Sequence, residues 1–194
     1  MSRTDVARRA GASAEVRDDA AAPARVLDRL DASRTVLWAS LGLKTLIVLA
    51  LVAANLMLGL SRFADRAMPA RMLLFPLLVA VVPAAWAWVN RGRPADRRVR
   101  YPALADLLIT LPFAIDMGGN ALDLYDRVHV FDDVCHLVNW FLLTAGFGVL
   151  LLARRELTPW VVAGLCVGFG TTTAVLWEVF EYLTFVTRSK ELPT

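Results

Sequence analysis

The sequence predicts an all-α protein, a polytopic transmembrane helix bundle of about five spans behind a disordered, charged N-terminal tail. Two observations support this prediction. Hydrophobic residues make up 57% of the 194 residues, more than a soluble domain of this size normally carries. They also gather, from about residue 36 onward, in stretches close to the ~20 residues that a helix needs to cross a ~30 Å hydrocarbon core.

The predicted spans are separated by short polar connections, so each can be delimited. We expect them at Val36–Leu60, Met72–Val89, Tyr101–Gly118, Val134–Ala153 and Trp160–Val186. Pro76 and Pro83 should bend the second span, because proline removes a backbone hydrogen bond inside a helix. Residues 35–190 are therefore assigned to one transmembrane helical domain.

Residues 1–34 differ in composition from the rest of the chain. Arginine, acidic residues and alanine alternate there, and large apolar residues are almost absent before Val26. Such a segment buries too little apolar surface to offset the entropy lost on folding. The sequence therefore predicts a disordered tail, which the distribution of charge assigns to the cytoplasm.

Positive charge predicts the orientation, because connections rich in Lys and Arg stay on the cytoplasmic side of a membrane. The tail and the connections after the second and fourth spans hold 14 of these residues, and the other connections together with the C-terminal end hold 6. We therefore expect a multi-pass protein of the bacterial cell inner membrane, with its N-terminus cytoplasmic and its C-terminus outside. The lipid bilayer is its expected partner. The basic run at residues 91–100 is explained by this topology, so no nucleic-acid partner is expected.

Ionisable residues of the last two spans are expected to meet near the outer membrane surface. The connection between these spans, residues 154–159, is short, so the two helices should be antiparallel neighbours. His136 and Glu178 each lie 18 residues from the inner boundary of their span, which places both at ~27 Å above it. The residues expected to converge are Asp132, Asp133, His136, Glu178 and Glu181, with Asp116 about a turn lower.

These residue types suit several kinds of chemistry. Acids at i and i+3, beside an Asp and a His at i and i+4, place ligands for a divalent metal ion on one helix face, so Asp132, His136, Glu178 and Glu181 are candidate metal ligands. In a metal-dependent, hydrolase-like enzyme for an amphipathic substrate, His136, Glu178 and Glu181 are the candidate catalytic residues. A proton- or cation-coupled transporter would use the same groups as a relay. In the structural alternative, the acids are solvated, cap a helix or bond to neighbouring helices.

Lys44 lies near the middle of the first predicted span, where an unpaired ammonium group is costly. Asp106, about a turn and a half inside the third span, is the nearest acidic candidate for its partner. A structural ion pair is the simplest role for the two residues. In a transporter, they would instead extend the polar path toward the cytoplasm.

Gly164 and Gly168 form a small-xxx-small pattern, which allows a second helix backbone to approach closely. On a helical wheel, both lie within about 80° of Thr171 and Glu178. We therefore expect this face to pack against protein, and we name the Gly164/Gly168 face as the surface for homo- or hetero-oligomers.

Three parts of the sequence resemble a known family. They are Leu111–Asp116 followed by Gly119–Asp126, Phe131–His136 with an Asp-Asp-x-x-His pattern, and Trp177–Tyr182 with a Trp-Glu-x-x-Glu pattern. Over roughly residues 100–190 the chain is similar to the YjdF-like family of uncharacterised bacterial membrane proteins. The resemblance implies a multi-helix membrane fold and supplies no substrate. Members usually continue past the equivalent of Glu191 into a further membrane segment, so the resemblance implies a shortened member here.

Overall fold

The computed structural model describes residues 26, 27, 29, 30, 33–63, 66–153 and 157–183. These residues form helices and turns without a strand, so the all-α prediction is confirmed. In chain order, the helices are α2 (Arg34–Leu56), α3 (Met68–Val79), α4 (Val81–Val89), the 3-10 helix η1 (Ala95–Arg97), α5 (Ala103–Ala121), α6 (Leu124–Arg127), α7 (Phe131–Leu152) and α8 (Pro159–Glu181). Most of the expected tail, residues 1–25, lies outside the described part of the chain.

Four segments are long and apolar enough to cross a membrane: α2, α3 together with α4, α7 and α8. Their outward faces carry large exposed hydrophobic side chains, among them Leu46, Leu73 and Val167. A soluble monomer rarely exposes apolar surface on this scale, whereas lipid chains solvate it well. The protein is therefore a multi-pass membrane protein.

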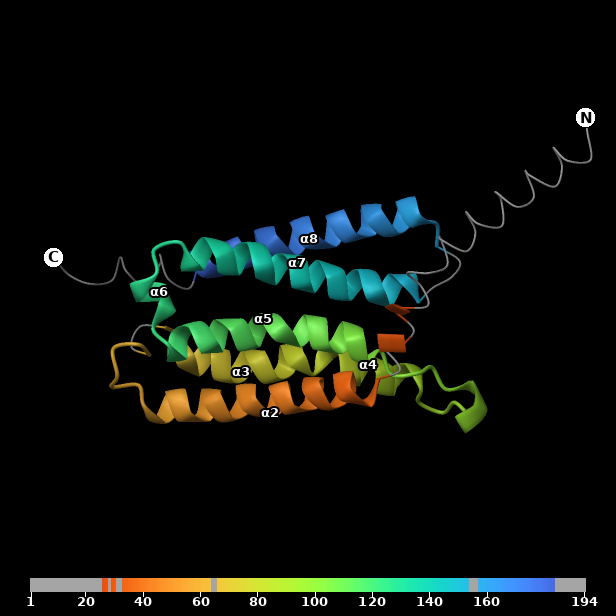
Figure 1. Ribbon diagram of the computed structural model, residues 1–194, viewed down its shortest axis with the longest axis horizontal. Coiled ribbons are helices and arrows are strands. Elements are labelled where there is room, and N and C mark those ends of the chain that lie inside the picture. Colours follow the sequence, from red (N-terminus) through yellow and green to blue (C-terminus); the bar gives the residue numbers. More distant parts are fainter. Residues whose placement is uncertain (1–25, 28, 31–32, 64–65, 154–156, 184–194) are drawn as a thin grey trace, which may run out of the picture.

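The third expected span, Tyr101–Gly118, corresponds to α5, the central helix of the bundle (Figure 1). It packs between α2 and α7 and also contacts α3. It contributes more buried residues than any other described helix, and Asp106, Thr110 and Asn120 are among them. Because protein surrounds α5, this helix can carry the carboxylates of Asp106 and Asp116, which lipid would not tolerate. It does not belong to the four segments above that are apolar enough to span on composition alone.

Two helix boundaries differ from the expected spans. The first long helix ends at Leu56, and the second begins at Met68, where Pro69 occupies the first turn and needs no hydrogen-bonded amide. One residue, Ala80, separates α3 from α4 in the second span. It follows Val79, whose carbonyl oxygen Pro83 cannot bond for lack of an amide hydrogen. The bend expected from Pro76 and Pro83 stays a prediction. Because the second helix starts one turn early, Arg71 belongs to α3 and not to the preceding connection.

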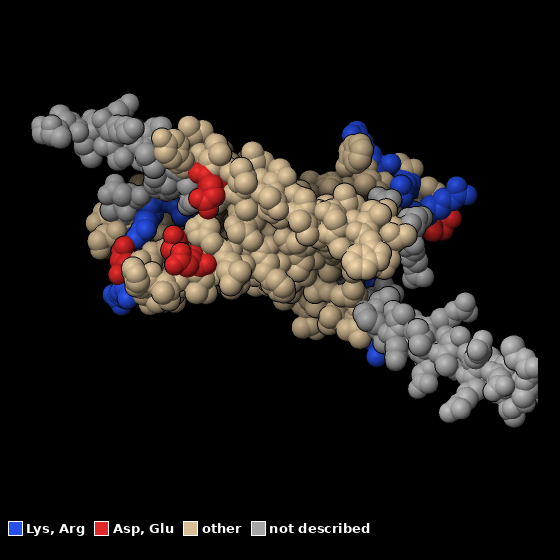
Figure 2. Space-filling view, turned by 90° about the horizontal axis from the view of Figure 1, so that it is seen from above, with Lys and Arg blue, Asp and Glu red and all other residues tan. Residues whose placement is uncertain are grey.

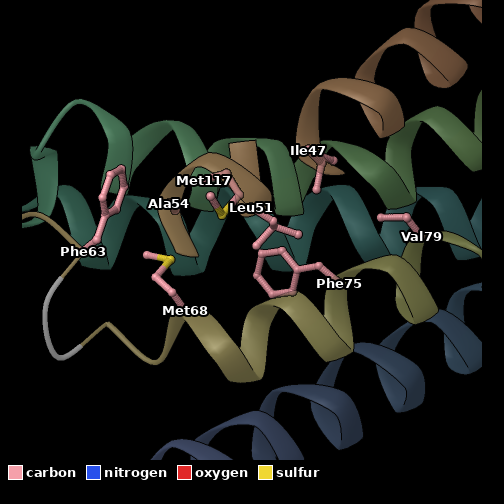
Figure 3. Close-up of a cluster of buried hydrophobic side chains, with 8 residues drawn as sticks. All are labelled: Ile47, Leu51, Ala54, Phe63, Met68, Phe75, Val79 and Met117. Carbon is pink, nitrogen blue, oxygen red and sulfur yellow. The ribbon is translucent and has the colours of Figure 1, made fainter. Parts of the chain in front are cut away.

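The apolar core lies among α2, α3 and α5 (Figure 3). Its buried residues are Ile47, Leu51, Ala54, Phe63, Met68, Phe75, Val79 and Met117. Phe75 also packs edge-on against Phe113, with ring centroids 4.9 Å apart. α7 and α8 contribute few buried residues, and α8 packs against α7. The bundle therefore consists of a well-packed unit of α2, α3 and α5, to which α7 attaches α8. Its two ends are called the α6 end and the η1 end, after the short helices that lie there (Figure 1).

Candidate functional site

The candidate site lies at the α6 end, where α7 begins and α8 ends. These two helices are antiparallel neighbours, as expected, and their contacts recur every fourth residue. A Cβ at Gly148 would lie 3.3 Å from Cys166 Sγ, and a Cβ at Gly170 would lie 2.9 Å from Thr144 Oγ1. Continuing the same register by two turns places His136 opposite Glu178. Close packing of small residues lower in the helix pair therefore aligns the ionisable groups at its end.

His136 lies between two carboxylates. Its Nε2 is 3.8 Å from Glu178 Oε1 on α8, and its Nδ1 is 3.7 Å from Asp132 Oδ1 one turn earlier on α7. Nδ1 also lies 3.1 Å from the backbone oxygen of Asp132. The histidine side chain is 30% exposed and that of Glu178 68% exposed, so solvent reaches the pair. Figure 2 shows acidic side chains gathered at this end of the molecule.

Not every residue expected in this cluster joins it. Within the part of the chain that the structure describes, no group of three or more His, Cys, Asp or Glu side chains is placed to hold a metal ion. Glu181 closes α8, and its side chain lies outside the described residues. Asp133 is exposed in the first turn of α7, whose N-cap is Val130 without a side-chain cap, so the acids do not cap this helix. Asp116 was expected to join the cluster, but pairs elsewhere.

Among the described residues, no other helix of this chain covers the Gly164/Gly168 face. A Cβ at either glycine would meet nothing within 4 Å, whereas Gly170 faces α7. A helical wheel shows which residues share a face, but not which face a neighbouring helix covers. Glu178 reaches His136 from the edge of the contact, and the use of the glycine face in oligomers stays a prediction.

A second polar cluster joins Lys44 of α2 to Asp106 of α5. The two side chains form an ion pair, as expected, with Lys44 15% and Asp106 1% exposed. Ser40 Oγ donates a hydrogen bond of 2.6 Å to Asp106 Oδ2, and Lys44 Nζ donates one of 3.0 Å to Ser40 Oγ. The ammonium group inside the bundle is therefore neutralised by a carboxylate that protein encloses.

A third cluster, absent from the sequence predictions, surrounds Asp116. Arg71 Nε donates a hydrogen bond of 2.8 Å to Oδ2 of Asp116, and Arg71 Nη2 donates one of 3.2 Å to Oδ1. Tyr125 donates its phenolic hydrogen to Oδ1 of Asp116 at 3.0 Å. Burial, and next the Asp116 charge, raise the pKa of Tyr125, so the phenol remains a donor. Arg66 pairs with Asp126 and lies over the Tyr125 ring.

A family model described as "Predicted membrane protein (DUF2238)" matches residues 43–191, which is more than half of the chain. The chain belongs to this family. The matched range includes Lys44, Asp106, His136 and Glu178, the residues of both sites predicted from the sequence. No curated protein and no solved structure matches the chain. The DUF2238 description agrees with the membrane location and names no activity.

The Arg71–Asp116 pair of this DUF2238 protein should contribute to its stability. Arg71→Gln is expected to reduce the free energy of unfolding by about 1–2 kcal/mol, because it removes a two-fold hydrogen bond from a carboxylate that is 13% exposed. The measurement is thermal unfolding of the purified protein in detergent. The control is Arg127→Gln, since Arg127 is 69% exposed and pairs with Asp123 on the surface. It should change stability by less than about 0.5 kcal/mol. Equal effects of the two changes would contradict the expected role of Arg71.

Proposed function

We propose that this DUF2238 protein is a hydrolase-like membrane enzyme, which acts on an amphipathic molecule at the membrane surface with a divalent cation held at the His136–Glu178 pair. The observation that carries the proposal is the 3.8 Å separation between His136 Nε2 and Glu178 Oε1. The two atoms come from different helices, which approach each other closely at Gly148 and Gly170. Such close packing suits a site that must hold its geometry.

The histidine environment explains why a cation is expected. The backbone oxygen of Asp132 can only accept a hydrogen bond, so in the neutral imidazole the proton resides on Nδ1. Nε2 is then an acceptor that faces an acceptor carboxylate. A proton or a cation between Nε2 and the Glu178 carboxylate would remove the repulsion between these two acceptors. Two ligands at about 2.1 Å from a tetrahedral ion are separated by about 3.4 Å, close to the distance between these atoms.

The remaining candidate ligands are Asp132 and Glu181. Asp132 Oδ1 lies 3.7 Å from the other ring nitrogen of His136, so a change of side-chain rotamer would be needed to bring it to Nε2. Glu181 stands one turn beyond Glu178 on α8. If His136, Glu178 and one of these carboxylates held a divalent cation, a coordination position would remain for water, and the ion would supply the acidity that makes this water a nucleophile for hydrolysis. A neighbouring carboxylate would take the proton of that water.

The position of the pair supports an amphipathic substrate. His136 and Glu178 lie at the end of two helices whose sides are apolar, and Glu178 is largely exposed. A molecule with its chain in the bilayer would present its polar group at this level. From the distribution of arginines we further infer that the α6 end faces outside the cytoplasm. The Asp-Asp-x-x-His and Trp-Glu-x-x-Glu patterns favour the YjdF-like group within the family.

The interior of the bundle favours this surface reaction over ion-coupled transport. Between the Lys44–Asp106 and Arg71–Asp116 pairs, the buried Thr110 hydroxyl donates its hydrogen bond to the Asp106 backbone oxygen. Apolar side chains of α2, α3 and α5 dominate the rest of this region. Ile47, Leu51, Phe75 and Phe113 are among them. A proton or cation relay needs polar groups or water in such a position. The surface site needs no path through the bundle.

Metal analysis of the purified protein tests the proposal. After equilibration with Zn²⁺ or Mn²⁺ and removal of excess ion, we expect about one ion per chain, since one site is proposed. His136→Ala and Glu178→Gln should each lower the affinity for the ion by more than about tenfold. His129→Ala is the matched control, because it removes the only other histidine and should leave the affinity unchanged.

The proposal also predicts activity that depends on the ion. Hydrolysis of a panel of amphipathic esters and phosphoesters should be lost with a chelator and restored by the metal. A protein that binds no divalent ion, or one in which His136→Ala binds as well as His129→Ala, would contradict the assignment. An ion bound normally without hydrolysis of any substrate class would overturn the reaction and retain the site.

A further inference from the structure

The connection between α4 and α5 is a folded, arginine-rich loop at the η1 end. Its two ends are held together by Asn90, which is buried. The Asn90 side chain accepts a hydrogen bond of 2.7 Å from the Val99 amide and donates one of 3.1 Å to the Val99 carbonyl oxygen. Trp86 Nε1 donates to the same oxygen at 2.8 Å. Residues 91–98 therefore form a closed loop of defined shape. Residues 90–100, which comprise this loop and the residues that flank it, are here called the arginine loop.

The conformation of this loop is supported at several points. Gly92 adopts φ +76°, which an L side chain would strain, and η1 forms one turn at its tip. The Trp86 ring packs edge-on against Tyr101, with centroids 5.4 Å apart. Every residue from Arg91 to Arg100 is nevertheless exposed. The chain thus builds a rigid frame whose side chains point away from the protein.

The loop carries five arginines and one acid. In the described part of the protein, the guanidinium groups of Arg91, Arg93 and Arg100 form no hydrogen bond or ion pair. Arg97 lies 3.9 Å from Asp96, and Arg98 donates a long hydrogen bond of 3.4 Å to the Arg93 carbonyl oxygen. Figure 2 shows these basic side chains projecting from the η1 end. The loop therefore presents a concentrated positive charge that the described protein leaves almost unneutralised.

The arginines at the α6 end behave differently, and the contrast is informative. Arg62 donates to the Ala121 carbonyl oxygen, Arg66 pairs with Asp126, Arg71 with Asp116, and Arg127 with Asp123. The chain thus supplies partners for arginines at one end and leaves those of the arginine loop to an external anion. Orientation in the membrane requires only the charge, and a disordered connection would provide it equally well. A clamped loop implies that the positions of the guanidinium groups matter.

The nearest anions to this loop are those of the bilayer. Trp88 in α4 and Trp160 in α8 are exposed at the η1 end, where the amphipathic indole ring favours the membrane interface. The arginine loop follows α4 directly, so its guanidinium groups lie at or just beyond the lipid phosphates. Arginine binds phosphate through paired hydrogen bonds of fixed geometry. We propose that the arginine loop binds the phosphate headgroups of anionic lipids. This proposal is independent of the His136–Glu178 site.

The test measures the lipid preference of the full-length protein reconstituted in bilayers that contain phosphatidylglycerol and phosphatidylcholine. The fraction of each spin-labelled lipid held at the protein surface gives the relative affinity. We expect a preference for phosphatidylglycerol, reduced at least about fivefold by the triple variant R93Q/R97Q/R98Q. Asn90→Ala keeps every arginine and removes the clamp, and it should reduce the preference about twofold or more.

The matched control is R62Q/R127Q, which removes two arginines at the opposite end and should leave the preference unchanged. Thermal unfolding identifies any variant that fails to fold, and for Asn90→Ala the substitution Asn90→Asp offers a second way to lose the amide donor. An unchanged preference in the triple variant would overturn the proposal. So would a wild-type protein that binds a short DNA duplex or an acidic peptide more tightly than phosphatidylglycerol vesicles. A preference unaffected by either Asn90 change would refute the role of the folded loop.

Discussion

Replacing Lys44 with methionine should reduce the free energy of unfolding by about 3–5 kcal/mol, the largest effect expected for a single side chain here. Methionine retains most of the volume and the flexibility of the lysine stem, so the destabilisation comes mainly from removal of the positive charge. It leaves the Asp106 carboxylate, 1% exposed, without its cation, while the Ser40 hydroxyl still donates a hydrogen bond to Oδ2. A buried carboxylate without its cation is strongly disfavoured in a helix bundle. Unfolding of the purified protein in mixed micelles measures the effect.

Removing the carboxylate of the pair should reduce the free energy of unfolding by less than removing the ammonium group. Asp106→Asn leaves the Lys44 ammonium, which is 15% exposed and carried on a long stem that can turn toward the membrane surface. The double variant K44M/D106L replaces the pair by apolar groups and should recover much of the loss, as burial of an ion pair gives little net stability. Thr45→Val is the control, because Thr45 is an exposed neighbour whose hydroxyl bonds only to the Leu41 carbonyl oxygen. If Lys44→Met resembles Thr45→Val, the ion pair does not support the bundle.

The Lys44–Asp106 and His136–Glu178 contacts could be predicted from the sequence because each depends on helix depth. An ammonium group within a span needs a partner, and the rise per residue restricts the choice to an acid at a similar level. The short connection between α7 and α8 likewise fixes two antiparallel neighbours. The depth of a residue in the membrane is counted from the end of its helix, and hydropathy locates these ends well enough to match residues at one level. The five-helix arrangement follows from the same reasoning.

The Arg71–Asp116 pair and the packing glycines required information that hydropathy does not hold. Arg71 belongs to α3 because the helix begins at Met68, with Pro69 in its first turn. The continuous apolar run starts only at Met72, so hydropathy alone places Arg71 outside the helix. Pro69 was the available signal, since proline favours the first turn of a helix. Gly164 and Gly168 have the spacing of a packing motif, whereas Gly170 and Gly146 make the contacts. Only the position of the neighbouring helix distinguishes these glycines.

Gly146 gives the second large prediction, because it lies where α7 crosses α5. A Cβ at this position would lie 2.7 Å from Ile109 Cγ1, 3.2 Å from the Ala105 backbone oxygen and 3.3 Å from Leu108 Cβ. The Ala105 contact involves backbone inside a helix, which cannot turn aside as a side chain does. Gly146→Val should therefore force α5 and α7 apart and cost about 3 kcal/mol, near the upper end of overpacking effects.

The consequence should extend to the candidate site, since α7 carries His136 and attaches α8 to the rest of the bundle. We expect Gly146→Val to lower both the unfolding midpoint and the affinity for a divalent ion, measured on the same purified sample. Gly42→Val and Gly118→Val are the matched controls, because a Cβ at either glycine meets nothing within 4 Å. Valine for glycine in an exposed helix position changes stability by less than about 1 kcal/mol, and in the favourable direction. If Gly146→Val is as stable as these two variants, α5 and α7 do not pack through a close backbone approach, and α7 must be held to the bundle by its larger side chains.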